Sequence, residues 1–133
     1  MTHDAARVRF IGKAIVAAHA VGGSIDGTES KPFTERLYSD WKSLNQDIEE
    51  APYWLATQMT SAFRSVGAPP AWVEEEPSWP FSQGEPMTFI SQAKVGELSP
   101  GEVVYVFAAR RLRGTGFSMV YRVVSQFSAD RNR

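Results

Sequence analysis

Cysteine is absent from this sequence, and histidine occurs only twice, as His3 and His19. The absence of cysteine excludes disulfides, thiolate chemistry and zinc sites that need cysteine ligands, and it is typical of proteins in a reducing compartment. Two histidines without a nucleophile motif such as Gly-x-Ser-x-Gly supply neither a catalytic triad nor a transition-metal site. We therefore expect no catalytic residues, no bound metal and no cofactor.

The sequence also lacks excess charge and long apolar runs. Its 14 basic and 15 acidic residues leave a net charge of −1, which creates no overall field to attract nucleic acid or an anionic membrane. No stretch approaches the roughly 20 apolar residues that span a bilayer. Residues 14–18 follow Arg7 and Arg9 as the apolar part of a secretory signal would. Because Lys13 and His19 interrupt such a segment, we expect no cleaved signal, no membrane partner and a cytoplasmic protein.

The chain is long enough for one folded domain. With 133 residues it can bury about two-thirds of the surface that its unfolded form exposes. We predict a single α+β domain over residues 1–133, in which N-terminal helices pack on a C-terminal, largely antiparallel sheet of three to four strands. The helical part covers about residues 4–66, a proline-rich arm about residues 67–86 and the sheet about residues 87–127. Residues 128–133 are polar, and we expect them to fray.

The first predicted element covers about residues 4–21. Thr2 is available as an N-terminal cap, and Gly22 and Gly23 are placed to stop a helix. Several β-branched residues leave a strand over residues 8–16 open as the alternative. We favour the helix, because apolar residues recur at helical spacing. These residues are Val8, Ile11, Ile15 and Ala18.

Two further helices have clear apolar stripes. The first begins near Pro32, where a missing N–H does no harm, and its stripe predicts Trp41 as a core residue. The second covers about residues 52–66, and Gly67 is placed to end it in the left-handed conformation. The stripes consist of Phe33, Leu37, Trp41, Leu44 and Ile48 in the first helix and of Leu55, Met59, Phe63 and Val66 in the second.

The arm is rich in proline. Proline fixes its own φ and pushes the preceding residue towards extended conformations, so we expect a stiff segment without helix. Trp72, Trp79 and Phe81 carry large apolar areas. Because such side chains are rarely left together in water, we expect them to attach the arm to the domain.

One segment at the end of the arm is similar to a known family. Ser78, Trp79 and Pro80 are followed, after a short polar gap, by the sequence GEPMTFISQ at residues 84–92. The whole segment resembles the WP…G.PM.F..Q pattern of the YwqG-like family of largely uncharacterised bacterial proteins. The resemblance covers about a ninth of the chain. It implies entry into a β-sheet and a bacterial origin, and it implies no activity.

The C-terminal part predicts three antiparallel strands. Residues 103–109 are apolar on both sides, as in a central strand that is covered on two sides. Residues 110–116 contain Gly114 and Gly116 and predict a hairpin loop. The flanking strands alternate, which places Met87, Phe89, Ser91, Ala93 and Val95 on the better-buried side of one and Phe117, Met119, Tyr121, Val123 and Phe127 on one side of the other.

Charge is distributed unevenly along this nearly neutral chain. Residues 67–102 contain six acidic residues and the single base Lys94, whereas residues 103–133 contain six basic residues and the single acid Asp130. Both groups have ordinary roles, because acidic runs are often solvated surface and arginines at a hairpin tip keep strands from aggregating. The acidic arm consists of Glu74, Glu75 and Glu76, and the basic hairpin contains Arg110, Arg111 and Arg113.

The basic hairpin does not predict nucleic-acid binding. It lacks the lysine and the following helix of a phosphate-binding loop, and a cluster of exposed aromatic residues for base stacking is not evident from the sequence. We therefore predict a non-enzymatic module, such as an immunity or adaptor protein, that recognises another protein by charge complementarity.

The acidic arm is our first choice of recognition surface, since its prolines order it before binding. The sequence leaves open whether the two charged groups pair with each other, and it leaves the oligomeric state open. The alternative function is an enzyme or a small-ligand-binding protein with an aromatic-lined pocket near Trp72, Trp79 and Tyr105.

Overall fold

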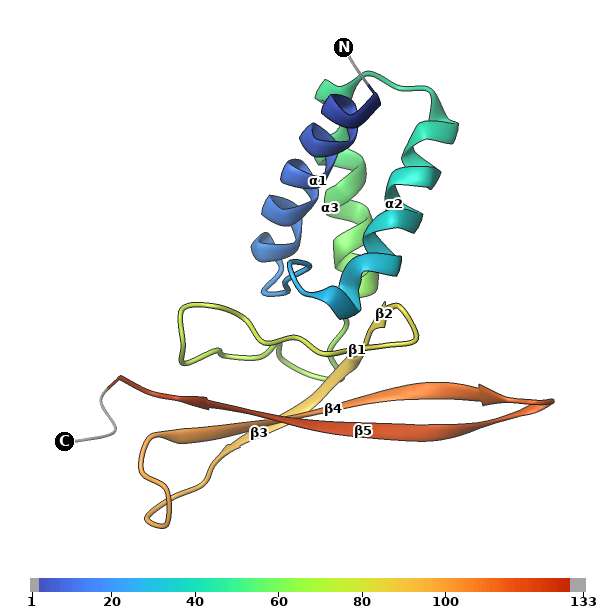
Figure 1. Ribbon diagram of the computed structural model, residues 1–133. Helices are drawn as coiled ribbons and strands as arrows, with labels where there is room; N and C mark the ends of the chain where they lie inside the picture. The colour runs from blue at the N-terminus through green and yellow to red at the C-terminus, as the bar shows by residue number, and fades with distance from the viewer. Residues whose placement is uncertain (1–2, 130–133) are drawn as a thin grey trace.

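The computed structural model describes residues 3–129, in which three helices precede a short hairpin and a three-stranded sheet (Figure 1). The helices are α1 (His3–Ala20), α2 (Lys31–Leu44) and α3 (Ala51–Ala62), and single 3-10 turns precede α2 (Thr28–Ser30) and α3 (Ile48–Glu50). Strands β1 (Phe81–Ser82) and β2 (Glu85–Pro86) form the hairpin. Strands β3 (Thr88–Lys94), β4 (Glu102–Arg113) and β5 (Gly116–Phe127) form the antiparallel sheet in the order β3-β4-β5. The predicted α+β class is confirmed. The predicted cap at Thr2 and the tail beyond residue 129 lie outside the described residues.

The end of α1 is fixed by two glycines, as predicted. The N–H of Gly22 donates to the carbonyl of His19 at 3.0 Å, and the N–H of Gly23 donates to the carbonyl of Ala18 at 2.9 Å. Gly22 has a φ of 80°, the left-handed conformation that ends many helices. Gly23 is needed for a second reason, because a Cβ there would lie 2.5 Å from the ring of Phe63. The chain therefore turns sharply and closely against the core.

The favoured helix is thus confirmed over the strand alternative for the first element. The buried side of α1 differs from the predicted stripe, however, because Val8 is exposed. The fully buried residues are Phe10, Ala14 and Ala18.

Helix α2 buries the predicted stripe over its first three turns, and Trp41 is confirmed as a core residue with 5% of its surface exposed. The stripe was predicted to continue to Ile48, which is wrong. Asn45 takes the left-handed conformation with a φ of 58° and ends the helix, so Ile48 belongs to the following 3-10 turn. Asparagine tolerates this conformation better than most residues, which explains the early stop.

Helix α3 also ends earlier than predicted. Leu55 and Met59 are fully buried, but the helix stops at Ala62, so Val66 and Gly67 are not its last turn. The segment after α3 is extended instead and forms a parallel bridge to β3, where the N–H of Phe89 donates to the carbonyl of Arg64 at 2.8 Å and the N–H of Val66 donates to the carbonyl of Phe89 at 2.9 Å. This segment satisfies part of the free edge of β3.

The hairpin between β4 and β5 is longer than predicted. The expected loop over residues 110–116 is mostly strand, because Arg113 still pairs with Gly116 and only two residues form the turn. Gly114 in that turn has a φ of 57°, which glycine adopts without steric cost. The three arginines of the basic hairpin therefore lie on a strand and not in a loop.

A β-bulge in β3 overturns the predicted alternation of that strand. Phe89 pairs with Phe107, but Ser91 pairs with Val106, so Ile90 is an extra residue. An extra residue moves every later side chain to the other face of the sheet. Ser91 and the residues that alternate with it therefore point away from Phe89, whereas they were predicted to share its side.

The arm forms a layer between the helices and the sheet (Figure 1). Residues 67–86 contain no helix, and Trp79 is only 5% exposed, so both predictions for the arm are confirmed. The ring of Trp79 lies 5.1 Å from that of Phe63 at the end of α3 and 5.2 Å from that of Phe107 on β4. One aromatic side chain thus joins the helical part to the sheet.

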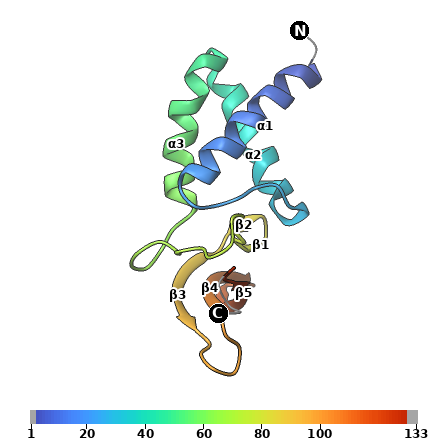
Figure 2. The same ribbon diagram turned by 90° about the vertical axis from the view of Figure 1, so that its left-hand side faces the viewer.

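The arm and the helices cover one face of the sheet, and Figure 2 shows both on the same side of β4 and β5. We call this the covered face. It consists of Val103, Tyr105, Phe107, Val120, Val124 and Gln126, with Phe89 from β3. The opposite face of β4 was predicted to be covered as well, which is wrong, because Val104 and Val106 remain partly exposed.

Candidate protein-binding surfaces

The acidic arm is held in place by one buried side chain of β5. The Oε1 atom of Gln126 accepts hydrogen bonds from the N–H groups of Val73 at 3.1 Å and Glu74 at 3.0 Å, and its Nε2 atom donates to the carbonyl of Glu76 at 2.8 Å. Gln126 is fully buried, so its side of these part-buried bonds is shielded from water. The backbone of the acidic arm is therefore ordered in the free protein.

The three carboxylates of the acidic arm are all exposed. That of Glu74 accepts a hydrogen bond at 2.8 Å from the N–H of Phe127, next to the end of β5. Within the described residues, none of the three takes part in an ion pair. Their charge is therefore available to a partner.

The basic hairpin presents its three arginines in two directions. Arg110 pairs with Met119, whereas Arg111 pairs with Ser118, so the two side chains leave opposite faces of the ribbon. The guanidinium of Arg110 lies 4.3 Å from the centre of the Phe117 ring, a cation–π contact. All three arginines, including Arg113, are exposed.

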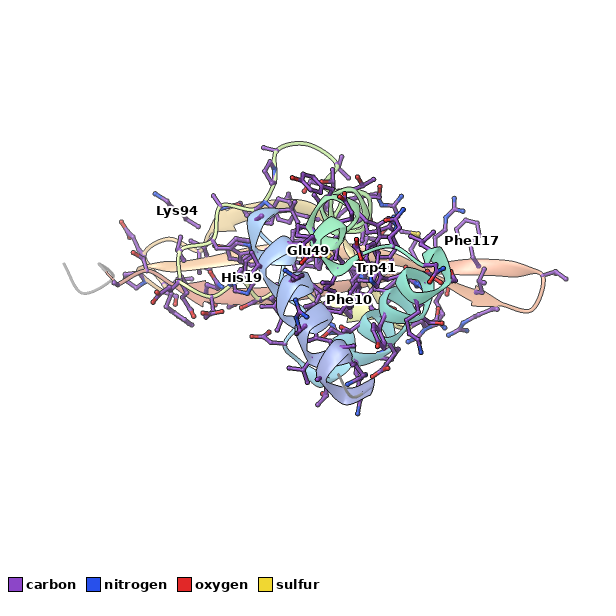
Figure 3. All side chains as sticks on the ribbon, turned by 90° about the horizontal axis from the view of Figure 1, so that it is seen from above. Phe10, His19, Trp41, Glu49, Lys94 and Phe117 are labelled. Atoms are coloured by element: carbon purple, nitrogen blue, oxygen red, sulfur yellow. The ribbon has the colours of Figure 1, made fainter. Side chains whose placement is uncertain are left out.

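The acidic arm and the basic hairpin do not pair with each other. The arm is bonded to Phe127 at one end of β5, and the arginines lie near Gly116 at the other end. A strand of this length spans about 36 Å. Figure 3 shows Lys94 and Phe117 towards opposite ends of the sheet, with the helices over its middle. The molecule therefore has an acidic end and a basic end.

Trp72, Trp79 and Tyr105 do come together, as the alternative function requires. The ring of Trp72 lies 4.6 Å from that of Tyr105 and 6.3 Å from that of Trp79. Their polar groups bind the chain itself, however, since the indole N–H groups of Trp72 and Trp79 donate at 2.7 Å to the carbonyls of Gly22 and Met87. These two bonds use the donors that a ligand in an aromatic pocket would need.

The Tyr105 hydroxyl is satisfied in the same way. It donates to the carbonyl of Ala71 at 3.0 Å and accepts from the N–H of Val73 at 3.1 Å. Burial raises the pKa of Tyr105 above its ordinary value, against the opposing effect of the bond from Val73. A hollow of about 250 Å³ is lined by Trp79 but by neither Trp72 nor Tyr105. The three aromatic side chains thus act as packing in this structure.

The second face of the sheet is apolar and exposed. Four apolar side chains of β5 on this face are Phe117, Met119, Tyr121 and Val123, which are 52%, 45%, 65% and 61% exposed. Their register partners on β4 share the face. We call this the open face, and it consists of Val104, Val106, Ala108, Arg110, Leu112, Phe117, Met119, Tyr121, Val123 and Ser125, with Glu102 and Phe127 at one end and Ser91 and Ala93 from β3 at the edge.

Sequence reasoning recognised the alternation of β5 but missed that its apolar side faces away from the helices. The sequence pattern points the other way, because the covered side of β5 carries the polar residues Gln126 and Arg122 beside Val124. Arg122 forms an ion pair with Glu29 at 2.9 Å, close to the start of α2. The polar side of β5 therefore meets the body of the protein.

Neither a metal site nor a membrane segment is found in residues 3–129. No cluster of three or more histidine, aspartate or glutamate side chains in this part of the chain could hold a metal ion. Its helices are all too short or too polar to cross a membrane. Comparison of the chain with protein-family models, curated proteins and solved structures gave no match. The resemblance of residues 78–92 to the YwqG-like family remains a prediction.

Proposed function

We propose that this protein is a non-enzymatic module that binds a protein partner, as immunity and adaptor proteins do. The observation that supports this most directly is the open face, where four large side chains of one rigid strand are about half exposed or more. Exposed apolar surface is unfavourable in water, so a contiguous patch of it usually marks a contact with another molecule.

The size of the open face supports the same function. Two strands of 12 residues and one of seven, about 4.8 Å apart, give a flat area of roughly 450 Å², polar side chains included. The largest apolar patch of a typical monomer measures roughly 300–600 Å² and is often functional. The open face lies within this range, and it is presented on a sheet that needs no ordering before it binds.

The charged ends of the molecule add orientation to this contact. Oppositely charged surfaces raise the rate of association with a complementary partner and exclude like-charged ones. The acidic arm remains the first choice for this role, because the bonds of Gln126 fix its backbone before binding. Two charged side chains share the open face with the apolar residues, Arg110 of the basic hairpin and Glu102 at the other end of β4.

The proposal is tested by capturing partners on the open face. A tagged form of the chain is compared with the variant Tyr121→Glu/Val123→Glu in an extract of the source cells, and bound proteins are identified by mass spectrometry. We expect the parent chain to capture at least one protein that the variant does not capture. An untagged copy of this chain counts as such a protein. Val16→Glu is the matched control, because Val16 is 70% exposed on α1, away from the sheet. Identical sets of bound proteins from all three forms would contradict the proposal.

The role of the charged ends is tested separately on the purified partner. Reversal of Glu74, Glu75 and Glu76 to lysine is expected to slow association at low salt and to weaken its dependence on salt, because steering is a long-range effect that ions screen. Equal association rates for this variant and the parent would exclude the acidic arm. The corresponding reversal of Arg110, Arg111 and Arg113 to glutamate then decides whether the basic hairpin steers the partner.

A further inference from the structure

We propose that the open face binds a second copy of this chain, so that two sheets pack face to face in an antiparallel, two-fold symmetric dimer. This inference rests on the proposed function and names the partner of the same surface. It follows from the order of side chains along the open face, from the placement of charge at its two ends and from its area.

The residues of the open face form rows across β4 and β5. Ala108 pairs with Tyr121 and Val106 pairs with Val123, and these two rows lie at the middle of the two strands. We place a two-fold axis between these two rows, parallel to the sheet and perpendicular to the strands. It brings the Tyr121 row of each copy onto the Val123 row of the other. An isologous contact of this kind requires only one surface to be self-complementary. The most exposed apolar side chains of β5 would then be buried at the centre of the interface.

The same axis brings opposite charges together. Arg110 lies two rows from the hairpin tip, and Glu102 lies at the other end of β4, on the same face. In the antiparallel arrangement, Arg110 of each copy therefore approaches the end of the partner that carries Glu102. In the parallel arrangement, the basic ends of the two copies would meet, and like charges would repel. The uneven charge of this nearly neutral chain thus selects one arrangement.

The area also fits a weak but specific dimer. The flat area of about 450 Å² increases when the relief of the side chains is included, and it approaches the lower limit of the roughly 600–1,000 Å² per partner of specific interfaces. The centre of the face is apolar, and Ser91, Ser125 and the charged ends form a polar rim, which is the usual anatomy of an interface. Two packed sheets of this type lie about 10 Å apart at an angle of about 30°.

The first experiment measures the mass of the chain in solution. Sedimentation or light scattering is carried out from about 1 μM to about 100 μM, the range of a weak dimer. We expect the wild-type chain to reach twice its monomer mass. Tyr121→Glu and Val123→Glu should each raise the dissociation constant at least about tenfold, because each buries a charge at the centre of the contact. Val16→Glu should leave it unchanged, and circular dichroism should show that all three variants are folded.

A second experiment tests the antiparallel arrangement by mixing two variants. Arg110→Glu and Glu102→Arg should each weaken the homodimer, because like charges then meet at both ends. In the mixed dimer of the two variants both pairs are attractive again, so mixing should restore association to within a few-fold of the wild type. In a parallel dimer Arg110 would meet Arg110 and Glu102 would meet Glu102, so each variant alone would only exchange one like-charged pair for another and should associate as the wild type does. Weakening of both variants alone, followed by recovery on mixing, therefore identifies the antiparallel arrangement.

Three results would overturn the inference. They are a wild-type chain that stays monomeric at about 100 μM, a dimer that survives Tyr121→Glu and Val123→Glu, and mixed variants that do not associate. A monomeric chain whose open-face variants still lose a captured protein would refute the dimer and leave the proposed function standing, with another protein as the partner. Capture that does not depend on the open face would refute the proposed function itself.

Discussion

The two faces of the sheet are made by the same strands but have different environments. On the covered face, Tyr105 and Phe107 are fully buried under the arm. On the open face, Tyr121 and Val123 of the neighbouring strand are more than half exposed. Both pairs of side chains are large and largely apolar, so the difference comes from what packs on each face. The covered face stabilises the fold of one chain, whereas the open face has apolar surface that is available to another.

The polarity of the β5 side chains would predict the opposite burial of the two faces. The covered side of β5 carries Gln126 and Arg122, which are polar, and the open side carries Tyr121 and Val123. Gln126 can be buried because all of its hydrogen-bonding atoms are satisfied by the arm. Arg122 reaches the edge of the body and pairs with Glu29. These two polar side chains can lie on the covered face because the chain itself supplies their hydrogen-bond and ion-pair partners.

The largest difference between the faces is expected for two phenylalanines. Phe107→Ala on the covered face should lower the free energy of unfolding by about 3 to 5 kcal/mol, since it leaves a cavity among Trp72, Trp79 and Phe89. Phe117→Ala on the open face should change it by only about 0.5 kcal/mol, as expected for an exposed site. Urea unfolding at low protein concentration measures both values. Equal losses would show that the faces are packed alike.

The next difference concerns adjacent residues of β5. Gln126→Leu should lower the free energy of unfolding by about 2 to 3 kcal/mol, because the N–H groups of Val73 and Glu74 and the carbonyl of Glu76 lose their partner. Ser125→Ala, on the open face, should change it by no more than about 0.5 kcal/mol. Hydrogen exchange at Val73 and Glu74 provides an independent readout, because their protection should fall in the first variant only. Unchanged exchange there would disprove the role of Gln126.

Tyr105 predicts a pH dependence for the covered face. Its pKa is raised in the folded state, so the neutral phenol contributes stability below the unfolded value of about 10, and this contribution is lost as the pH rises through the folded value. The free energy of unfolding should therefore fall more steeply between about pH 9 and about pH 11 in the wild type than in Tyr105→Phe. Parallel curves for the two proteins would show that Tyr105 titrates alike in both states.

Glu102 predicts the smallest effect, on the open face and in the opposite pH range. Hydrogen bonds from Ser125, and to a lesser extent from Ser99, lower the pKa of Glu102, while slight desolvation opposes them. The stability from these bonds is present above the unfolded value of about 4.3 and is lost as the pH falls through the folded value. Carbon-13 NMR titration of Glu102 should show a higher midpoint in Ser125→Ala. A midpoint that does not move would exclude the bond from Ser125.

Sequence periodicity predicted the buried side of a helix well where the spacing of apolar residues decides which side faces the core. The stripe through Leu37 and Trp41 was correct because these side chains face a core formed largely by neighbouring helices. It failed at the ends of α2 and α3. The left-handed Asn45 and the bonds of Arg64 and Val66 to β3 depend on local strain and on a distant strand, which a pattern of apolar residues does not contain.

The candidate surfaces could be predicted only in part. The residues of the acidic arm and of the basic hairpin are exposed as expected, because charge is rarely buried without a partner. Alternation also grouped Phe117, Met119, Tyr121 and Val123 correctly on one face. It could not say which face the arm covers, since that choice depends on Gln126 and on the bulge at Ile90. These two features are set by tertiary contacts.

The bonds of Gln126 to the acidic arm have a consequence for the order in which the chain folds during synthesis. They join residues that are 50 to 53 positions apart, and Gln126 is made after every other element of the sheet has been completed. Because chains emerge from the ribosome N-terminus first, the helices can form while the arm is still loose. The bonds of Trp72 and Trp79 to Gly22 and Met87 can form earlier, but the acidic arm is fixed only when the end of β5 has been made. Until then the covered face of β4 lacks its neighbouring strand.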